Sequence, residues 1–185
     1  MYVMTNFKQP VKLTKCKICR TEYRKWSISQ KVCSNPDCAI ALVELDKAKK
    51  QRQADKARRI ELKSKREWLK DTQAVFNSYI RKRDHGQPCI SCGTTASIQY
   101  CAGHYRTVGA CPELRFEPLN VHLQCNKNCN MEKSGNIVLY RIELIKKIGI
   151  DKVEWLEGTH KPKKWTVDDL KEIIKTYKQL TKDLA

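Results

Sequence analysis

Two pairs of cysteines enclose the part of the chain whose residues are best suited to chemistry. Cys89 and Cys92 have C-x2-C spacing, and Cys125 and Cys129 have C-x3-C spacing. Together the four thiolates supply the ligands of one tetrahedral zinc ion. Because a fully occupied sulfur site keeps no open coordination position, we predict a structural zinc. Its ligation stabilises a segment that is too small for a proper hydrophobic core.

Polar side chains between these pairs are candidates for catalysis. His104 is a natural general base, because a neutral imidazole titrates near neutral pH. Arg106, two residues later, is suited to bidentate contact with a phosphate oxygen. Hydrolysis of a phosphodiester requires an activated water, a cation that stabilises charge on the phosphate, and fixed geometry. These residue types therefore indicate a metal-dependent nuclease.

Two segments of this region carry a resemblance. Residues 102–106 (AGHYR) and 120–125 (NVHLQC), together with Asn130, resemble the His-Asn-His (ββα-metal) nuclease superfamily. In that superfamily a His at the end of the first strand deprotonates the attacking water, a middle Asn orients this His, and a last residue holds one catalytic divalent cation. The resemblance implies these three roles for His104, Asn120 and Asn130, with magnesium or manganese as the catalytic ion.

The residue before the candidate base departs from the superfamily pattern. Superfamily members often carry Asp there as the second metal ligand, whereas this chain has Gly103. The sequence leaves Glu113, Glu132 and His122 as alternative ligands and does not rank them. A thiolate from Cys101 would be a poor ligand for magnesium. The C-x3-C spacing is also one residue longer than the usual C-x2-C.

A closer resemblance covers nearly the whole chain. The segments CISCG, AGHYRT, LRF, N-x-H-x-Q-C, KSGN and YR-x-E-L-I, with the late pair Trp165-Thr166, resemble the NinG (Rap) recombination nuclease family of lambdoid phages. That resemblance implies a structure-specific endonuclease for branched DNA, including Holliday junctions and D-loops. It also implies a phage protein that works in the cytoplasm of the bacterial host. Since resolving a junction symmetrically needs two cuts, we expect a homodimer.

Composition agrees with a partner that is a polyanion. The chain has 185 residues, 37 of them Lys or Arg and 20 Asp or Glu, for a net charge of +17. Such a balance is typical of proteins that bind nucleic acid, although ribosomal and membrane-surface proteins share it. No apolar run is long enough for a signal peptide or a transmembrane helix, so we expect a cytosolic protein without a membrane partner. In a reducing compartment, cysteines in close pairs favour zinc over disulfides.

Residues 1–40 contain a second cysteine frame. Cys16 and Cys19 are followed by Cys33 and Cys38, which predicts a zinc knuckle or ribbon. The chain should therefore bind two structural zinc ions. The knuckle has three possible roles that the sequence does not separate: contact with DNA, contact with a partner protein such as a recombination protein, or capping of the following helix.

Residues 41–84 lack Pro and Gly, and they predict a long basic helix. Its first half is poor in apolar residues and either is a spacer, pairs with a second chain, or is simply a solvated face. Its second half has an apolar stripe that begins at Trp68 and should pack on the core. Salt-dependent phosphate contacts are expected from basic residues on this helix. The candidates are Lys56, Arg58, Arg59 and Lys63.

Residues 85–136 should form a ββα-metal core, and residues 137–185 should form helices around it. Short strands are predicted at 98–101 and 121–124, and a helix near Cys125 should carry Asn130 and Lys133. Of these, Lys133 is a further candidate for contact with DNA, and His122 is either a DNA contact or a structural residue. Three helices should follow, at 137–148, at 151–156 and after the capping box of Thr166 and Asp169. The predicted fold class is mostly α, with a small zinc-framed core, a knuckle and a long basic helix.

Three hypotheses on function stay open at this point. The first is an endonuclease for branched recombination intermediates. The second is a non-catalytic zinc protein that binds DNA or recruits recombination proteins, and the third is a nuclease of the same fold without preference for branches. In the second case His104 is a structural or zinc-binding histidine, Asn120 is a turn former and Asn130 is a helix-terminal polar residue.

Overall fold

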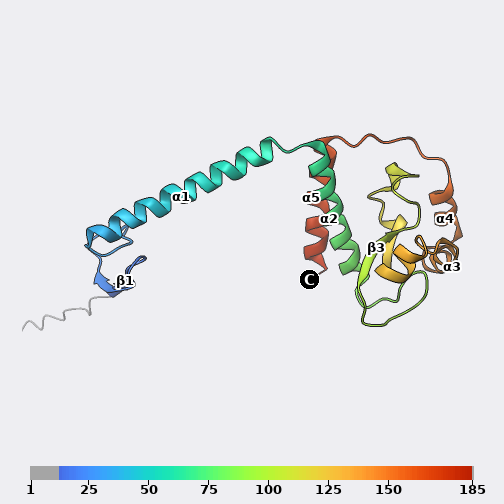
Figure 1. The fold of residues 1–185 in the computed structure, drawn as a ribbon, viewed down its shortest axis with the longest axis horizontal. Helices are drawn as coiled ribbons and strands as arrows, with labels where there is room; N and C mark the ends of the chain where they lie inside the picture. The colour runs from blue at the N-terminus through green and yellow to red at the C-terminus, as the bar shows by residue number, and fades with distance from the viewer. Residues whose placement is uncertain (1–12, 185) are drawn as a thin grey trace, which may run out of the picture. The chain divides into compact units, whose positions relative to one another are not determined.

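The computed structural model describes residues 13–184. These residues form two compact units, of which the first ends at Leu62 and the second begins at Lys63. The predicted fold class is confirmed. The chain is mostly helical, with two small antiparallel sheets (Figure 1). It also contains two clusters of four cysteines. Among the described helices, none has the length and apolar character that crossing a membrane requires.

The first unit contains a small hairpin and one long helix. Strands β1 (Leu13–Lys15) and β2 (Glu22–Arg24) pair antiparallel. Helix α1 (Pro36–Glu61) starts at Asn35, whose side chain accepts the backbone N–H of Asp37 and so satisfies one free donor of the first turn. From residue 43 to residue 62 every side chain is exposed, so only the start of α1 packs on the knuckle.

The knuckle and the start of α1 share one core. Cys16, Val32 and Cys38 are buried together, and Leu42 from the second turn of α1 packs against them. The cysteine frame therefore covers the first turns of α1 as well as closing the knuckle. This packing agrees with the predicted capping role. It excludes neither contact with DNA nor contact with a partner protein.

The structure divides the predicted basic helix in two. The first helix ends at Glu61, and α2 (Lys65–Arg83) begins after Ser64. Ser64 accepts the backbone N–H of Glu67, and the Glu67 carboxylate accepts the N–H of Ser64. This capping box stabilises the extended backbone of Ser64, between the two helices. The motif S-x-x-E is visible in the sequence and marks the start of α2.

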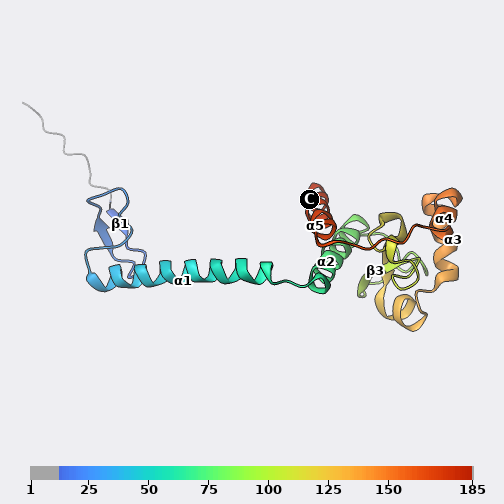
Figure 2. The same cartoon turned by 90° about the horizontal axis from the view of Figure 1, so that it is seen from above.

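In the second unit, two helices pack as a pair beside a central hairpin. Helix α5 (Val167–Asp183) lies along α2 in both views (Figures 1 and 2). Phe76 of α2 meets Tyr177 of α5 edge to face, with ring centroids 4.8 Å apart. The predicted capping box of Thr166 and Asp169 is present at the start of α5.

The central hairpin consists of β3 (Tyr100–His104) and β4 (Val121–Cys125), with His104 opposite Val121. The first strand thus lies two residues later than predicted, because the bend at 97–98 delays pairing and leaves Ile98 exposed. One face of the hairpin packs on α2 and α5. The long connection between the strands contains two single 3-10 turns, η1 (Pro112–Leu114) and η2 (Pro118–Asn120).

The segment after β4 is π-helical rather than α-helical. It is η3 (Asn126–Glu132), and the sulfur of Cys125 caps it by accepting the backbone N–H of Cys129 at 3.3 Å. Two helices follow, α3 (Ile137–Ile148) and α4 (Ile150–Glu157). They are separated by Gly149 at φ +89°, a conformation that favours glycine. Both contribute to a second apolar cluster with the loop between the strands.

Candidate active site and metal centres

The central cysteines converge as predicted. The Sγ atoms of Cys89, Cys92, Cys125 and Cys129 all lie within 4.8 Å of one another. The backbone N–H of Cys125 donates to the sulfur of Cys89 at 3.3 Å. Burial of Cys89 raises its pKa, but donors from the backbone of Cys125, Cys92 and Ser91 outweigh this effect and lower it overall. Four sulfur donors at this spacing fit a structural zinc ion, which this cluster would hold between the hairpin and η3.

The N-terminal cysteines form the second such cluster. The Sγ atoms of Cys16, Cys19, Cys33 and Cys38 also lie within 4.8 Å of one another. Cys16 and Cys38 are buried, and Cys19 is exposed. The donor set again fits zinc, so the structure supports two zinc sites in the described chain. Neither Cys101 nor Cys111 belongs to a cluster.

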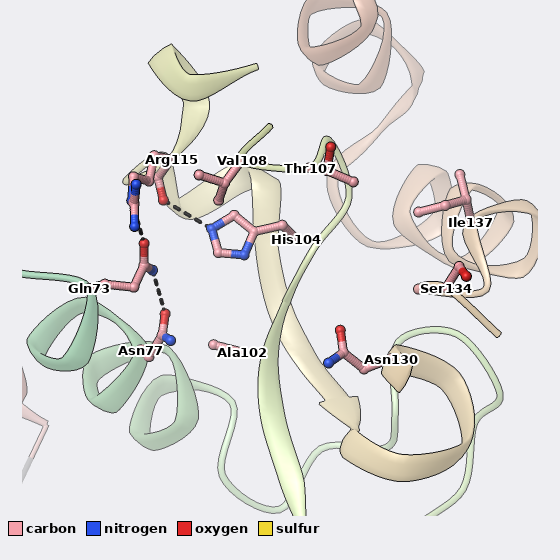
Figure 3. Close-up of a pocket in the computed structure, with 11 residues that line it drawn as sticks. Gln73, Asn77, Ala102, His104, Thr107, Val108, Arg115, Asn130, Ser134 and Ile137 are labelled. Atoms are coloured by element: carbon pink, nitrogen blue, oxygen red, sulfur yellow. Dashed lines mark hydrogen bonds between the residues drawn. The ribbon is translucent and has the colours of Figure 1, made fainter. Parts of the chain in front are cut away.

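His104 ends strand β3 and faces a pocket. Its Nε2 lies 3.0 Å from the backbone oxygen of Arg115. Since a carbonyl oxygen only accepts, Nε2 carries the proton, and Nδ1 keeps the lone pair. Nδ1 points into the space between Asn77 and Asn130 (Figure 3). Burial lowers the pKa of His104 below its ordinary value of 6.5, so the neutral, basic form predominates at neutral pH.

Asn120 organises the loop that holds this imidazole. Its side chain is completely buried, and its hydrogen bonds go to Arg106 and Leu114 rather than to His104. The Oδ1 atom accepts the backbone N–H of Arg106 at 2.7 Å. The Nδ2 atom donates to the backbone oxygens of Arg106 and Leu114, at 3.0 and 3.2 Å. Asn120 thereby fixes both ends of the segment from Arg106 to Leu114. The next residue, Arg115, orients His104 through its backbone oxygen.

The pocket beside His104 has a volume of about 550 Å³, and its walls are polar and apolar in nearly equal parts. Asn130 of η3 lines it on one side of β3, and Gln73 and Asn77 of α2 line it on the other (Figure 3). His104 and Asn130 are thus brought to one cavity, and Asn120 supports it from behind. Within the described range 13–184, no Asp or Glu lines this pocket. Neither Glu113, Glu132 nor His122, the proposed alternative ligands, reaches it.

Arg115 is a residue of the pocket that sequence reasoning passed over. Its Nε donates to Oε1 of Gln73 at 2.8 Å, and Nε2 of Gln73 donates to Oδ1 of Asn77 at 2.7 Å. This chain of contacts fixes a guanidinium at the wall of the pocket. Arg115 belongs to the LRF segment that carries the family resemblance, which was the available signal. Arg106, the predicted phosphate contact, instead donates to the sulfur of Cys111 at 3.4 Å and does not line the pocket.

Gly103 occupies its position because a neighbouring side chain fills the adjacent space. A Cβ at Gly103 would lie 2.3 Å from Oε1 of Gln124. The Nε2 atom of Gln124 donates to Ser91 and to the backbone oxygen of Gly135, each at 2.6 Å. Oε1 of Gln124 is buried without a hydrogen-bond partner. The side chain that the superfamily often places before the His is therefore excluded here, and a carboxamide takes its space.

We expect Gly103→Ala to destabilise the hairpin. The methyl group must displace Gln124, and overpacking of this kind costs about 1–3 kcal/mol. Thermal unfolding measures the loss. Gly109→Ala is the matched control, because a Cβ there meets no atom within 4 Å. Equal melting temperatures for the two variants would mean that Gln124 moves aside freely.

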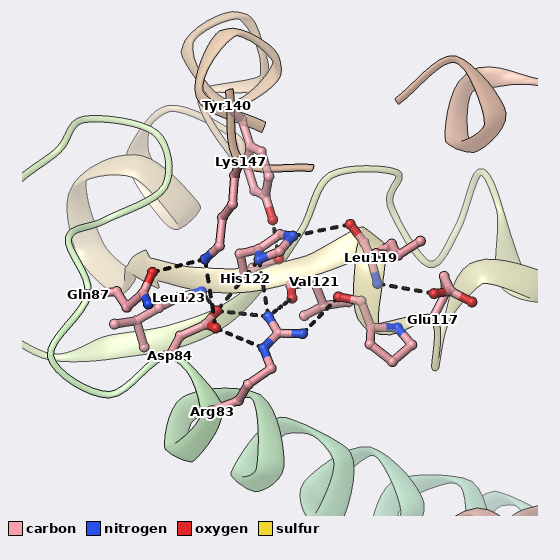
Figure 4. A network of polar contacts seen from close by, with 12 residues as sticks. Arg83, Asp84, Gln87, Glu117, Leu119, Val121, His122, Leu123, Tyr140 and Lys147 are labelled. Atoms are coloured by element: carbon pink, nitrogen blue, oxygen red, sulfur yellow. Dashed lines mark hydrogen bonds and ion pairs between the residues drawn. The ribbon is translucent and has the colours of Figure 1, made fainter. Parts of the chain in front are cut away.

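The surroundings of His122 favour the structural role over the alternative of a DNA contact. It is 3% exposed, and both ring nitrogens are engaged. Nε2 donates to the backbone oxygen of Leu119 at 3.2 Å, and Arg83 donates to Nδ1 at 3.1 Å. Arg83 also donates to both oxygens of buried Asp84 at 2.8 Å, and Asp84 accepts the backbone N–H of Leu123 (Figure 4). This network joins the end of α2 to β4, so a phosphate cannot reach His122.

The other predicted DNA contacts differ in their surroundings. Lys56, Arg58 and Arg59 on α1 are exposed, as is Lys133 after η3. Lys63 is instead engaged within the second unit. Its ammonium group pairs with Asp71 and lies 4.2 Å from the centroid of the Trp68 ring. Lys63 would have to break these contacts to bind a phosphate, so it is the weakest of the predicted DNA contacts.

These features define the class of the molecule: a mostly helical protein with two small hairpins, two four-cysteine clusters suited to zinc, and a pocket beside His104 at the end of the central hairpin. Residues 8–185 match the family described as Bacteriophage Lambda NinG protein, and the chain belongs to that family. The resemblance to this family seen in the sequence is thus confirmed.

Several curated proteins are similar along most of their length. Protein ninG of Escherichia phage 933W is 42% identical over 188 residues, which cover 92% of each chain. Protein ninG of Salmonella phage P22 is 42% identical over 90% of each chain. Protein ninG of Escherichia phage lambda is 41% identical over 90% of this chain and 89% of its own. No solved structure matches the chain at a significant level.

Proposed function

We propose that this protein is an endonuclease that hydrolyses phosphodiesters in branched DNA, such as Holliday junctions and D-loops. The observation that carries the proposal is the pocket at the end of β3. There an imidazole with a free, basic Nδ1, a fixed guanidinium and an amide from η3 converge on one cavity. A base, a cation for phosphate oxygens and a polar ligand are the groups that hydrolysis of a phosphodiester requires.

In this proposal His104 accepts the proton of the attacking water through Nδ1, while its Nε2 stays bonded to the Arg115 backbone. Asn120 is a positioning residue, because it acts on His104 only through the loop. The Arg115 guanidinium binds a non-bridging phosphate oxygen. These assignments use only side chains whose orientation is fixed by the contacts described above.

The pocket fits a divalent cation only in part. Asn130 would hold magnesium or manganese through its amide oxygen, whereas Gln124, with its buried and unpartnered Oε1, does not line this pocket. When bound, such an ion stabilises negative charge on the phosphate. With no carboxylate in the pocket, the DNA phosphate must supply most of the ligand charge. Affinity for the ion should therefore be weak until DNA is bound.

Family membership and surface charge support branched DNA as the substrate. The exposed basic residues of α1 supply phosphate contacts that do not depend on base sequence. Two matched cuts across a junction require two active sites, so we propose that the protein works as a homodimer, alone or with recombination proteins. We place this activity in the cytoplasm of the bacterial host, where phage DNA recombines.

Purified protein should be incubated with a synthetic four-way junction and with a linear duplex of matched sequence, each with magnesium or manganese. The expected result is cleavage of the junction and little cleavage of the duplex. Equal cleavage of both would support the nuclease without branch preference. Inertness toward both would reject the proposal.

The second candidate function is a non-catalytic protein that binds DNA or recruits recombination proteins. The absence of any carboxylate at the pocket favours it, because magnesium sites usually include one or two. Under this hypothesis the junction is bound without being cut. The cleavage assay above therefore separates the two candidates directly.

The pH dependence of cleavage follows from the surroundings of His104. Burial lowers its pKa below 6.5, so the base loses its lone pair only at more acidic pH. We expect the cleavage rate to be constant around neutral pH and to fall as the pH drops through this lowered pKa. Single-turnover rates at saturating junction measure the profile. A rate that instead keeps rising between about pH 7 and 9 would assign the proton transfer to another group.

A further inference from the structure

The knuckle presents two large apolar side chains to solvent at one loop. Trp26 is 84% exposed and Ile28 is 100% exposed, and both lie in the turn between β2 and the second cysteine pair. An indole that the protein's own fold leaves exposed beside a second exposed apolar side chain indicates an interaction surface. The proposed nuclease site does not use this loop.

The loop is ordered by its own hydrogen bonds. The backbone N–H of Trp26 donates to Oε1 of Gln30 at 3.0 Å, and Nε2 of Gln30 donates to the backbone oxygen of Val32 at 2.9 Å. The hydroxyl of Tyr23 donates to the backbone oxygen of Gln30 at 3.1 Å. Since Tyr23 and Val32 pack on the cysteine cluster, the loop is anchored to the zinc frame. Exposure of the indole is therefore a property of the fold.

The surface around this loop is strongly basic. Between residues 13 and 35 the one acidic residue is Glu22, against six basic residues. All six are exposed, and none forms an ion pair with another described residue. They are Lys15, Lys17, Arg20, Arg24, Lys25 and Lys31. Unpaired cations around an exposed aromatic ring complement a polyanion whose bases offer flat apolar faces.

We propose that this loop, Trp26 to Gln30, is a binding site for unstacked nucleotides of DNA. Trp26 stacks on a base, Ile28 packs against the same gap in the base stack, and the surrounding cations bind the flanking phosphates. In a continuous duplex the bases stay stacked on one another, so no base face is accessible to Trp26. Branch points and single-stranded gaps expose base faces. The knuckle thus selects interrupted DNA, which deepens the proposed function and rests on it for the identity of the substrate.

The test measures affinity rather than cleavage, with the full zinc-loaded protein. A labelled duplex with a single-stranded gap is compared with the uninterrupted duplex at one salt concentration. Trp26→Ala should weaken binding to the gapped DNA by roughly 5- to 100-fold and binding to the duplex by less than about two-fold. Trp26→Phe should keep most of the affinity. Trp155→Ala, which removes a half-exposed indole from α4, is the control and should change neither.

Zinc content and melting temperature show whether each variant is folded. If Trp26→Ala is not folded, the proposal is tested with Trp26→Phe and Ile28→Asp instead. Of these two variants, only Ile28→Asp should lower the preference for gapped DNA. Unchanged affinities in the folded variants would overturn the proposal and favour a protein partner. An equal loss on gapped and continuous DNA would also overturn it. Since binding is measured directly, a protein that cuts no DNA still gives an answer.

Discussion

Replacing His104 with alanine is expected to slow cleavage of a four-way junction by about 10²- to 10⁴-fold, the usual contribution of a general base. Among the described residues that line the pocket, the imidazole is the only titratable side chain that is neutral and basic at neutral pH. No other residue of the pocket is placed to accept the proton of water. Rates under single-turnover conditions measure the effect without the complication of product release.

Affinity for the junction should change little in the same variant. His104 contributes no charge to DNA binding when it is neutral, and the exposed cations of the two units are untouched. His85→Ala is the matched control, since this exposed histidine lies outside the pocket. Wild-type rates in His104→Ala would remove His104 from the mechanism. A parallel loss of affinity and rate would indicate a binding role.

A melting experiment separates chemistry from structure in these variants. Removing the ring leaves the backbone oxygen of Arg115 without its donor, which costs about 1 kcal/mol. Such a loss shifts the melting temperature by a few degrees and leaves the protein folded at the assay temperature. A large loss of rate at a small loss of stability is therefore the signature of catalysis.

The sequence predicted the parts of the site that depend on spacing along the chain. Cysteine pairs, a short strand before His104 and the capping box at Thr166 are local patterns, and each is present, although the strand begins two residues later than predicted. Even Ser64, which divides the basic helix, carried a recognisable local signal. Short motifs also indicated the NinG family, to which the chain belongs.

What the sequence did not provide depends on contacts between distant segments. The burial of His122, a residue of β4, follows from Arg83 and Asp84, which come from the end of helix α2. The reason for Gly103 lies in Gln124 across the hairpin. Arg115 enters the pocket because Gln73 of α2 fixes its guanidinium. In each case a pairing set by the tertiary fold decides the role of a residue whose neighbours in sequence are uninformative.

Loss of the central zinc should unfold the second unit. Cys129→Ser removes one of the four sulfur ligands, and we expect zinc content to fall from two ions per chain to one. Zinc ligation by such sites contributes about 10–16 kcal/mol, which is comparable to the whole stability of a small domain. The hairpin is only two strands wide, so it has little else to hold η3 in place. Circular dichroism and thermal melting measure the outcome.

Two further cysteine variants show whether the effect belongs to the central site. Cys111→Ser changes another buried cysteine, which lies outside both clusters, and it should keep both zinc ions and nearly all stability. Cys38→Ser should also lose one zinc, but from the first unit, so the melting of the second unit should persist. If Cys129→Ser keeps two zinc ions, the four central sulfurs are not one site. If it loses the ion and melts like the wild type, the apolar clusters alone hold the hairpin, and the position of His104 does not depend on zinc.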